Sequence, residues 1–262
     1  MLIIDGNNLL WKSFYVSNKS VINVCKIFLT LVSKTRPNFN KYRHFNGIYI
    51  VWDAFNSWRF DAYKEYKATR SKDDDSLQAF LEARRYLKET VIPRDTTYKQ
   101  IMIPGFEADD IIADIVRNQK DGIIFIVSSD KDFLQLIRGD PITMVQRIGQ
   151  VDDFHIINTK RFIDKHGYHP RLWSHVRAMS GDSSDNIPGV KGVGIKNAER
   201  LIIKYGSLPG IFVNGDDGDR YVRLVKANYK KLMEWFRLVD LNENHSGKLI
   251  NYINNQFKKV VI

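Results

Sequence analysis

The stretch YKQIMIPGFEADDIIADIV (residues 98–116) carries the pattern that decides the fold. Residues 98–103 predict a short buried strand from their β-branched content, and Pro104 and Gly105 mark its end. A helix is predicted over 107–118, and one face of it is apolar at Ala108, Ile111, Ile112 and Ile115, the i, i+3, i+4 and i+7 positions. A strand followed directly by an amphipathic helix is the repeating unit of α/β sheets.

The same alternation runs through the first 130 residues. Other strands are predicted at 2–4, 47–52 and 122–127, and other amphipathic helices near 20–34 and 75–91. We therefore expect an α/β fold with a mostly parallel central sheet and helices on both faces. TMVQ (143–146) and FHIIN (154–158), joined by a turn with Asp152 and Asp153, predict a hairpin at the sheet edge.

The character of the chain changes near Thr159. TKRFIDKHG, PRLWSHVRAMSG, IKNAERLIIKYG and residues 220–240 all have helical spacing, and a Gly follows several of them as a helix stop. The sequence therefore predicts two regions, an α/β core over 1–158 and a helical region over 159–262.

Composition narrows the class of protein. The 262 residues carry 40 Lys and Arg against 30 Asp and Glu, a net charge of +10, which suits nucleic acid first and an anionic membrane surface second. Cys25 is the single cysteine, which excludes an internal disulfide framework and thiolate metal sites. The N-terminal MLIIDGNNLL lacks a basic segment and meets Asp5 early, so we expect neither a signal peptide nor a membrane span, and a cytoplasmic protein.

Acidic residues follow three of the predicted strands. Asp5 ends the first, Asp53 ends the second, and Asp130 and Asp132 follow the strand at 122–127. A single Asp after a strand is more often the cap of the next helix. Because parallel strands end at one edge of a sheet, where open α/β sheets place their sites, these acids should also meet one another. Capping alone poorly explains three such strands.

Glu107, Asp109 and Asp110 crowd the start of the helix at 107–118. Acids in a first helical turn complement the helix dipole, but one or two would satisfy that role. Three acids beside other strand-end acids would repel one another strongly unless cations lie among them. Oxygen ligands without cysteine or clustered histidine favour Mg²⁺ or Mn²⁺ over Zn²⁺.

Two further acids, Asp182 and Asp185, lie in GDSSDNIPGVKGVGIKNA (181–198). A solvated turn would also favour Asp, Ser and Gly. The glycine-containing turn that follows opens a helix, and backbone N–H groups at such a helix start bind phosphate. Lys191 and Lys196 add positive charge to this turn.

A basic and aromatic stretch follows Asp53. Its basic residues are Arg59, Lys64, Lys67, Arg70 and Lys72, and its aromatic residues are Phe55, Trp58, Phe60, Tyr63 and Tyr66. Such interleaving is typical of surfaces on which bases stack and phosphates are neutralised. The alternative is a solvated helix whose aromatic side chains pack inward.

Together, IIDGNNLL, EYKATR, GFEADD, VSSDKDF and GDSSDNIPGVKGVGIKNA resemble the flap endonuclease / 5′–3′ exonuclease family, which includes phage 5′ nucleases and the nuclease domain of bacterial DNA polymerase I. The resemblance spans nearly the whole chain. It implies a helical arch over about 67–95 and a helix–hairpin–helix over about 186–205. Because the chain ends at Ile262, we expect neither a polymerase domain nor a clamp-binding tail.

The resemblance also assigns roles to residues. It implies a metal-binding acidic cluster that consists of Asp5, Asp53, Glu107, Asp109, Asp110, Asp130, Asp132, Asp182 and Asp185. It places Lys67 and Arg70 at the scissile phosphate, as catalytic residues with Asp5 and Asp53. The implied DNA contacts are Tyr66, as a base-stacking residue, Arg177, Gly189, Lys191, Gly192, Gly194 and Lys196.

The expected function is a structure-selective 5′ nuclease that cleaves DNA, and RNA–DNA hybrid ends, by in-line hydrolysis with two Mg²⁺ ions, for which Mn²⁺ can substitute. The resemblance adds a monovalent cation such as K⁺ at the helix–hairpin–helix, and we expect a monomer. Two alternatives are a PIN-type ribonuclease, whose fold would be far shorter, and a DNA-binding relative without activity, which would lack some of the acids.

Overall fold

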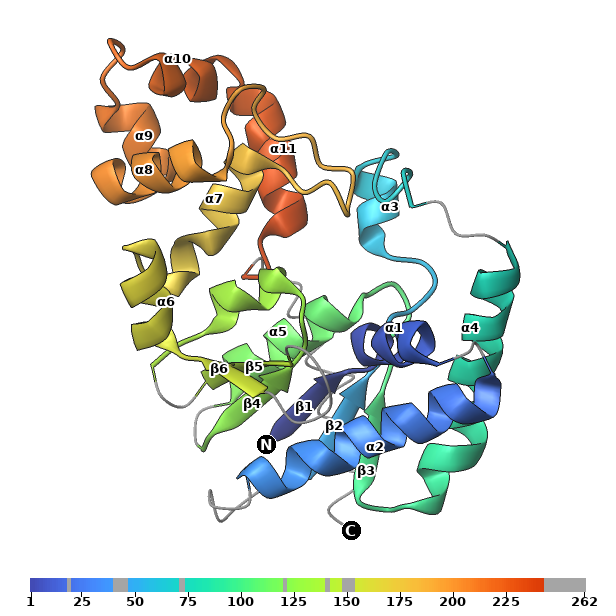
Figure 1. The fold of residues 1–262 in the computed structure, drawn as a ribbon. Coiled ribbons are helices and arrows are strands. Elements are labelled where there is room, and N and C mark those ends of the chain that lie inside the picture. The colour runs from blue at the N-terminus through green and yellow to red at the C-terminus, as the bar shows by residue number, and fades with distance from the viewer. Residues whose placement is uncertain are drawn as a thin grey trace.

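The computed structural model describes residues 1–17, 20–39, 47–70, 74–119, 122–139, 142–147 and 154–242. Within them the chain forms one six-stranded sheet in the order β3-β2-β1-β4-β5-β6 (Figure 1). Its strands are β1 (Leu2–Asp5), β2 (Ile48–Val51), β3 (Tyr98–Ile101), β4 (Ile124–Val127), β5 (Ile142–Arg147) and β6 (Phe154–Ile157).

The pairing of the strands confirms the predicted sheet. β1 pairs in parallel with β2 and β4, β2 with β3, and β4 with β5. Among these six strands only β5 and β6 are antiparallel, and they form the predicted hairpin at the edge. The predicted turn with Asp152 and Asp153 lies outside the described residues.

Eleven α-helices lie within the described residues, together with four short π or 3-10 segments. The helices are α1 (Gly6–Val16), α2 (Val21–Phe39), α3 (Trp58–Ala62), α4 (Asp74–Tyr86), α5 (Ala108–Asn118), α6 (Thr159–His166), α7 (Trp173–Ser180), α8 (Ile195–Tyr205), α9 (Leu208–Asn214), α10 (Arg220–Ala227) and α11 (Tyr229–Val239). The short segments are η1 (Leu87–Val91), η2 (Ile92–Arg94), η3 (Lys131–Leu136) and η4 (Pro170–Leu172). The helices predicted near 20–34, 75–91 and 107–118 correspond to α2, α4 with η1, and α5.

Both faces of the sheet are buried, which explains the nearly continuous apolar strands. Successive side chains of a strand point to opposite faces. In β1, Leu2 and Ile4 therefore join one core with α1, α2 and α4, whereas Ile3 joins another with α5. The predicted stripe of α5 packs into this second core.

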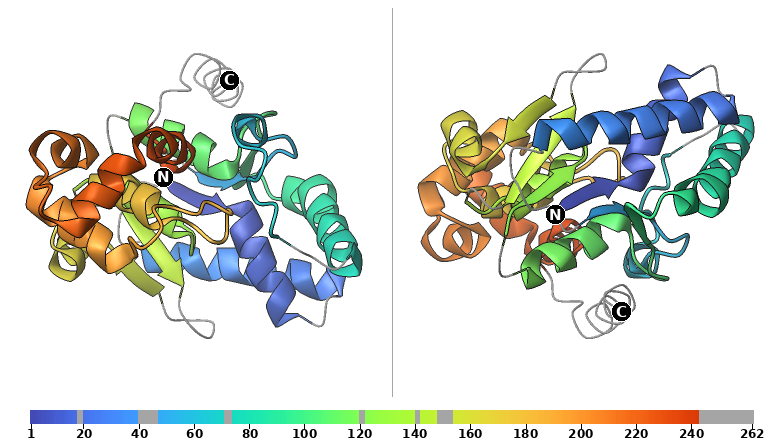
Figure 2. Two further views of the ribbon diagram at one scale, coloured as in Figure 1. Left: turned by 90° about the horizontal axis from the view of Figure 1, so that it is seen from above. Right: turned by 90° about the horizontal axis from the view of Figure 1, so that it is seen from below.

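The C-terminal helices extend this second core. It runs from Ile3 in β1 through Ile111 in α5 to Trp173 in α7, Leu201 in α8 and Leu241 after α11. Figure 2 shows α7 to α11 gathered at one end of the molecule, with the loop between α7 and α8 reaching toward the centre. The sheet and the helical region therefore share one packed interior.

The predicted boundaries of two regions remain predictions. The expected arch corresponds in part to α4, η1 and η2, but residues 71–73 lie outside the described part of the chain. So does the C-terminal segment 243–262 of the predicted helical region. No helix in the described ranges is both long and apolar enough to cross a bilayer.

Candidate metal centre and nucleic-acid interface

Acids from separate strand ends meet at one edge of the sheet. Asp5 closes β1, Asp53 follows β2 and Asp130 follows β4, and all three line a cavity of about 150 Å³. Glu107 and Asp109, at the start of α5, line the same cavity. The parallel order of the strands is what brings these residues together, because it carries every strand end to the same edge.

Carboxylates that accept from backbone N–H groups fix the start of α5 beside the end of β2. Asp53 Oδ1 accepts from the backbone N–H of Ala108 at 2.8 Å. The N-cap is Glu107, and its own N–H donates to Asp110 Oδ2 at 3.2 Å in a capping box. Helix capping and the grouping of acids therefore coexist here, so the two interpretations of the sequence were not exclusive.

A second group of acids consists of Asp132, Asp182 and Asp185. One carboxylate oxygen of each lies within 4.8 Å of the other two, a spacing that could hold a metal ion. Arg177, predicted to contact DNA, lies between these acids, because its Nε is 3.3 Å from Asp132 Oδ1 and its Nη2 contacts Asp182. Its guanidinium therefore faces the acids in this structure.

The segment with Lys67 and Arg70 is held against the loop that carries Asp185. The backbone N–H of Lys67 donates to the Asp185 carbonyl at 2.9 Å. Arg70 Nε donates to Ser184 O at 2.8 Å, and Arg70 Nη2 lies 2.6 Å from Asp185 Oδ1. Lys67 Nζ lies 2.5 Å from Glu107 Oε1, so both cations lie beside carboxylates of the site.

Tyr66 does not fit its predicted role in base stacking. Its side chain is only 2% exposed, so the ring offers no free face to a base. Its hydroxyl lies 2.7 Å from Glu107 Oε2 and 3.1 Å from Asp185 Oδ2, and so bridges the two groups of acids. Among the aromatic residues of the stretch after Asp53, Phe55 is the most exposed, at 71%.

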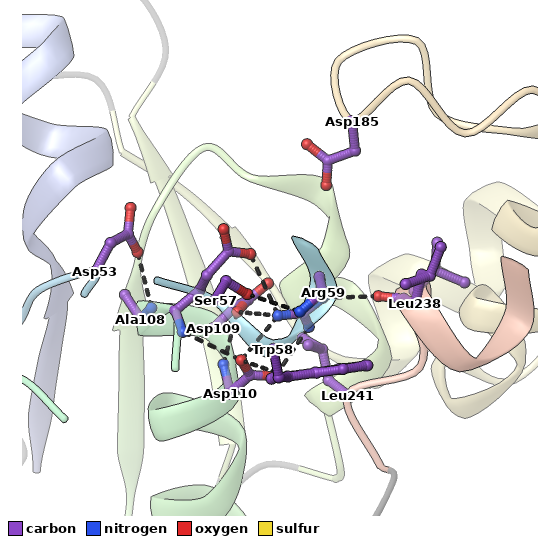
Figure 3. A network of polar contacts seen from close by, with 12 residues as sticks. Asp53, Ser57, Trp58, Arg59, Ala108, Asp109, Asp110, Asp185, Leu238 and Leu241 are labelled. Atoms are coloured by element: carbon purple, nitrogen blue, oxygen red, sulfur yellow. Dashed lines mark hydrogen bonds and ion pairs between the residues drawn. The ribbon is translucent and has the colours of Figure 1, made fainter. Parts of the chain in front are cut away.

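Arg59 is not part of a basic surface but the most buried cation of the site, with 1% of it exposed. Figure 3 shows its guanidinium among Asp109, Asp110 and the end of α11. It forms a two-pronged ion pair with Asp110 at 2.8 and 2.9 Å. It also lies 3.2 Å from Glu107 and 3.5 Å from Asp109. Part of the positive charge that the crowded acids require is thus supplied by Arg59.

Burial and mutual repulsion shift the pKa values of the carboxyl groups. Burial, and then the charge of Asp53, raises the pKa of Asp5 to about 7. Burial and the charge of Asp130 likewise raise the pKa of Asp132 to about 7. Burial would raise the pKa of Glu107 too, but Lys67 and Arg59 hold it below its usual value.

Three polar residues of the site were missed by the sequence reasoning. Asn7 Nδ2 donates to Asp53 Oδ2 at 2.6 Å, and the Ser128 hydroxyl donates to Asp5 Oδ2 at 2.9 Å. Asn8 Oδ1 accepts from the Ser129 backbone N–H at 3.1 Å, which ties α1 to the end of β4. The sequence signal was present in GNN after Asp5 and in the two serines before Asp130, where polar residues cluster at strand ends.

The donor set fits divalent metal ions. Most of the predicted acids either line the cavity or form the cluster of Asp132, Asp182 and Asp185, which adjoins the cavity through Tyr66 and Asp130. Asn7 Oδ1 is buried and, within the described part of the chain, accepts no hydrogen bond. Buried, oxygen-only donors of high charge are typical of Mg²⁺ and Mn²⁺ sites.

The glycine-containing turn lies apart from the cavity. Gly194 is the N-cap of α8, and no side chain caps that helix. Lys191 and Lys196 are exposed beside it. Gly189 and Gly192 have φ values of +65° and +88°, in the left-handed region. Neither the turn nor its lysines contribute to the lining of the acidic cavity.

The sequence matches two family models that together cover most of its length. Residues 1–167 match the 5′–3′ exonuclease N-terminal resolvase-like domain, and residues 168–251 match the 5′–3′ exonuclease C-terminal SAM fold. The 5′–3′ exonuclease of Mycoplasmopsis pulmonis is 34% identical over 216 residues, which are 80% of this chain and 68% of that protein. The chain belongs to the 5′–3′ exonuclease family, which confirms the predicted family and enzyme class.

Other relatives are much longer. A thermostable DNA polymerase I of Thermus thermophilus is 29% identical over 225 residues, which are 82% of this chain but 25% of that protein. The chain thus spans about a quarter of the length of this polymerase.

Solved structures confirm the predicted fold class. A structure of T5 5′-exonuclease with bound zinc has a TM-score of 0.80 and 20% sequence identity, and the match covers 98% of each chain. A complex of the T5 flap endonuclease with DNA and metal ions has a TM-score of 0.77 and 20% identity, covering 98% of this chain and 97% of that one.

Proposed function

We propose that this protein is a structure-selective 5′ nuclease that hydrolyses phosphodiesters in DNA with divalent metal ions, preferably Mg²⁺ with Mn²⁺ as a substitute. The observation that carries the proposal is the acidic cavity, where Asp5, Asp53, Glu107, Asp109 and Asp130 meet Lys67 and Arg70. Carboxylates that hold metal ions and cations that face them form a site with both of the charges that phosphoryl transfer needs.

In this proposal the carboxylates of the cavity hold one metal ion, and Asp132, Asp182 and Asp185 contribute to a second. The metal ions would supply an activated water and neutralise charge on the leaving oxygen. Asn7 and Ser128 orient Asp53 and Asp5 through hydrogen bonds, so those carboxylates keep their positions when the cavity is filled.

Lys67 and Arg70 are proposed to bind the scissile phosphate. Both cations line the cavity and are held by carboxylates, Lys67 by Glu107 and Arg70 by Asp185. A substrate phosphate would exchange these ion pairs for its own and so place developing charge beside two fixed donors.

The duplex part of the substrate is proposed to contact the turn before α8. Exposed Lys191 and Lys196 and the uncapped N-terminus of α8 provide sites for phosphate without regard to base sequence. We further propose a monovalent cation such as K⁺ at this turn. The substrates proposed are 5′ ends and 5′ flaps, with RNA–DNA hybrids among them, bound by a monomer.

The test uses a 5′-labelled flap DNA incubated with and without Mg²⁺. The expected result is a short labelled product that requires metal and that Asp130→Asn no longer forms. Affinity for the same DNA in EDTA should fall little or rise in this variant, because a negative charge near phosphate is removed. Cleavage that persists in Asp130→Asn, or in EDTA, would contradict the proposal.

A further inference from the structure

Asp110 differs from the other acids of the cluster in where its side chain goes. Asp109, one residue earlier, lines the acidic cavity, whereas Asp110 does not and is 3% exposed. Both oxygens of Asp110 are occupied within the protein. Arg59 binds both of them, and Trp58 Nε1 donates to Oδ2 at 3.2 Å.

Arg59 joins three elements that are distant in sequence. It lies in α3, it binds acids at the start of α5, and its Nε donates to the carbonyl of Leu238 in the last turn of α11 at 2.9 Å (Figure 3). Its planar fork fits the bidentate pair with Asp110, and one of its nitrogens also faces Glu107 and Asp109. Both terminal nitrogens of the guanidinium are therefore directed at the start of α5, while Nε faces α11.

We propose that Arg59 and Asp110 are a buried positioning pair that holds Glu107 and Asp109 for the metal ions, and that Asp110 is not itself a metal ligand. Asp110 neutralises Arg59 and fixes its guanidinium, and Arg59 in turn fixes the two carboxylates that reach the cavity. The capping bond from the Glu107 N–H to Asp110 locks the backbone between them. The inference rests on the proposed metal-dependent function.

The first experiment compares Asp110→Asn with Asp109→Asn, a matched control from the same helical turn. Thermal unfolding is measured in EDTA, so it needs neither metal nor activity. Asp110→Asn leaves the buried charge of Arg59 without its main partner and should lower Tm by roughly 10 °C. Asp109→Asn relieves repulsion in the cavity and should leave Tm unchanged or raise it. An Asp110→Asn protein as stable as the parent would overturn the pairing.

The second experiment measures Mn²⁺ affinity by calorimetry without DNA. Arg59→Lys keeps the charge but loses the fork, and Arg59 cannot bind a cation itself. Displacing the groups that orient metal ligands typically weakens metal binding by about 10–100-fold, and we expect that loss in Arg59→Lys and in Asp110→Asn alike. Because Arg59 and Asp110 act through one pair, the variant with both substitutions should bind Mn²⁺ no more weakly than whichever single variant has the lower affinity.

Additive losses of Mn²⁺ affinity in the double variant would make Asp110 an independent ligand. Unchanged affinity in Arg59→Lys would leave Arg59 only a role in folding.

Trp58→Phe serves as a milder variant, because it removes one bond to Asp110 and keeps an aromatic ring. It should weaken Mn²⁺ binding several-fold, and an unchanged affinity would count against the pair. Absence of cleavage by the parent protein would refute the proposed function and leave these binding and unfolding results to decide the inference.

Discussion

The side-chain amide of Asn186 donates to the backbone carbonyl of Glu65 at 2.7 Å and so ties the loop after α7 to the segment that carries Lys67 and Arg70. Asn186 has a φ of +57°, a left-handed conformation that asparagine adopts more readily than most residues. The residue thus serves the loop in two ways, through its backbone and through its amide.

Two substitutions separate these contributions. Asn186→Gly keeps the left-handed backbone but loses the amide, whereas Asn186→Ala loses both. We expect Asn186→Gly to keep Tm within a few degrees and to slow single-turnover cleavage by about tenfold or more, because small displacements of catalytic groups are costly. Asn186→Ala should also lower Tm. Parent-like cleavage by Asn186→Gly would show that the amide bond does not position Lys67 and Arg70.

Lys67 allows chemistry to be distinguished from binding. If it meets charge that develops in the transition state, Lys67→Ala should lower kcat by roughly 10²–10³ and change KM little. If Lys67 merely attracts DNA, Lys67→Ala should instead raise KM and reduce the slope of log affinity against log salt concentration by about one. We expect the first result. Single-turnover rates at two salt concentrations measure both quantities, and a parent-like rate once DNA is bound would contradict it.

The turn before α8 predicts a selective loss of binding. Gly194 has an ordinary backbone conformation, and nothing lies within 4 Å of a Cβ added there, so Gly194→Val should fold, with Tm lowered by no more than a few degrees for the poorer N-cap. The new side chain would occupy the space where a phosphate approaches the N-terminus of α8. Affinity should fall for duplex-containing DNA far more than for single strands. Gel-shift titrations with both substrates check this, and equal losses would make the turn purely structural.

The raised pKa values of Asp5 and Asp132 predict how the metal-free protein responds to pH. Both are near 7 in the folded protein and about 3.9 in the unfolded chain, so the folded state holds more protons between those values. Their contribution to stability is therefore lost as pH rises from about 4 to 7. In EDTA, Tm should fall by several degrees between pH 5.5 and 7.5, and Asp132→Asn should reduce that fall.

Mg²⁺ should act in the opposite direction. Because metal ions bind the deprotonated carboxylates, added Mg²⁺ should raise Tm more at pH 7.5 than at pH 5.5. An equal rise at both values of pH would indicate that these carboxylates do not hold the metal.

Much of the sheet and the meeting of the acids could be predicted because both depend on short-range pattern and one topological rule. The apolar runs that became β1, β2 and β4 were short and bounded, and each was followed by an acid. Parallel order then required Asp5, Asp53 and Asp130 to share an edge. No long-range contact had to be known for that step.

Arg59 and Tyr66 were misjudged for the opposite reason. In sequence they look like the other members of a basic and aromatic stretch, and nothing local distinguishes a buried arginine from an exposed one. Arg59 donates a hydrogen bond to the Leu238 carbonyl, 179 residues away, and the Tyr66 hydroxyl donates one to Asp185, 119 residues away. Such partners follow from packing of the helical region against α3, which periodicity does not reveal.

The interior shared by the sheet and the C-terminal helices limits how this chain could be recombined. The family models divide the sequence between residues 167 and 168, but Phe162 and Trp173 pack edge to face across that point, at 5.9 Å between ring centroids. Neither segment covers its apolar surface alone. The two segments are therefore exchangeable between related proteins only as a matched pair. A chimera joined at this point requires side chains that pack together across the junction more than it requires a compatible linker.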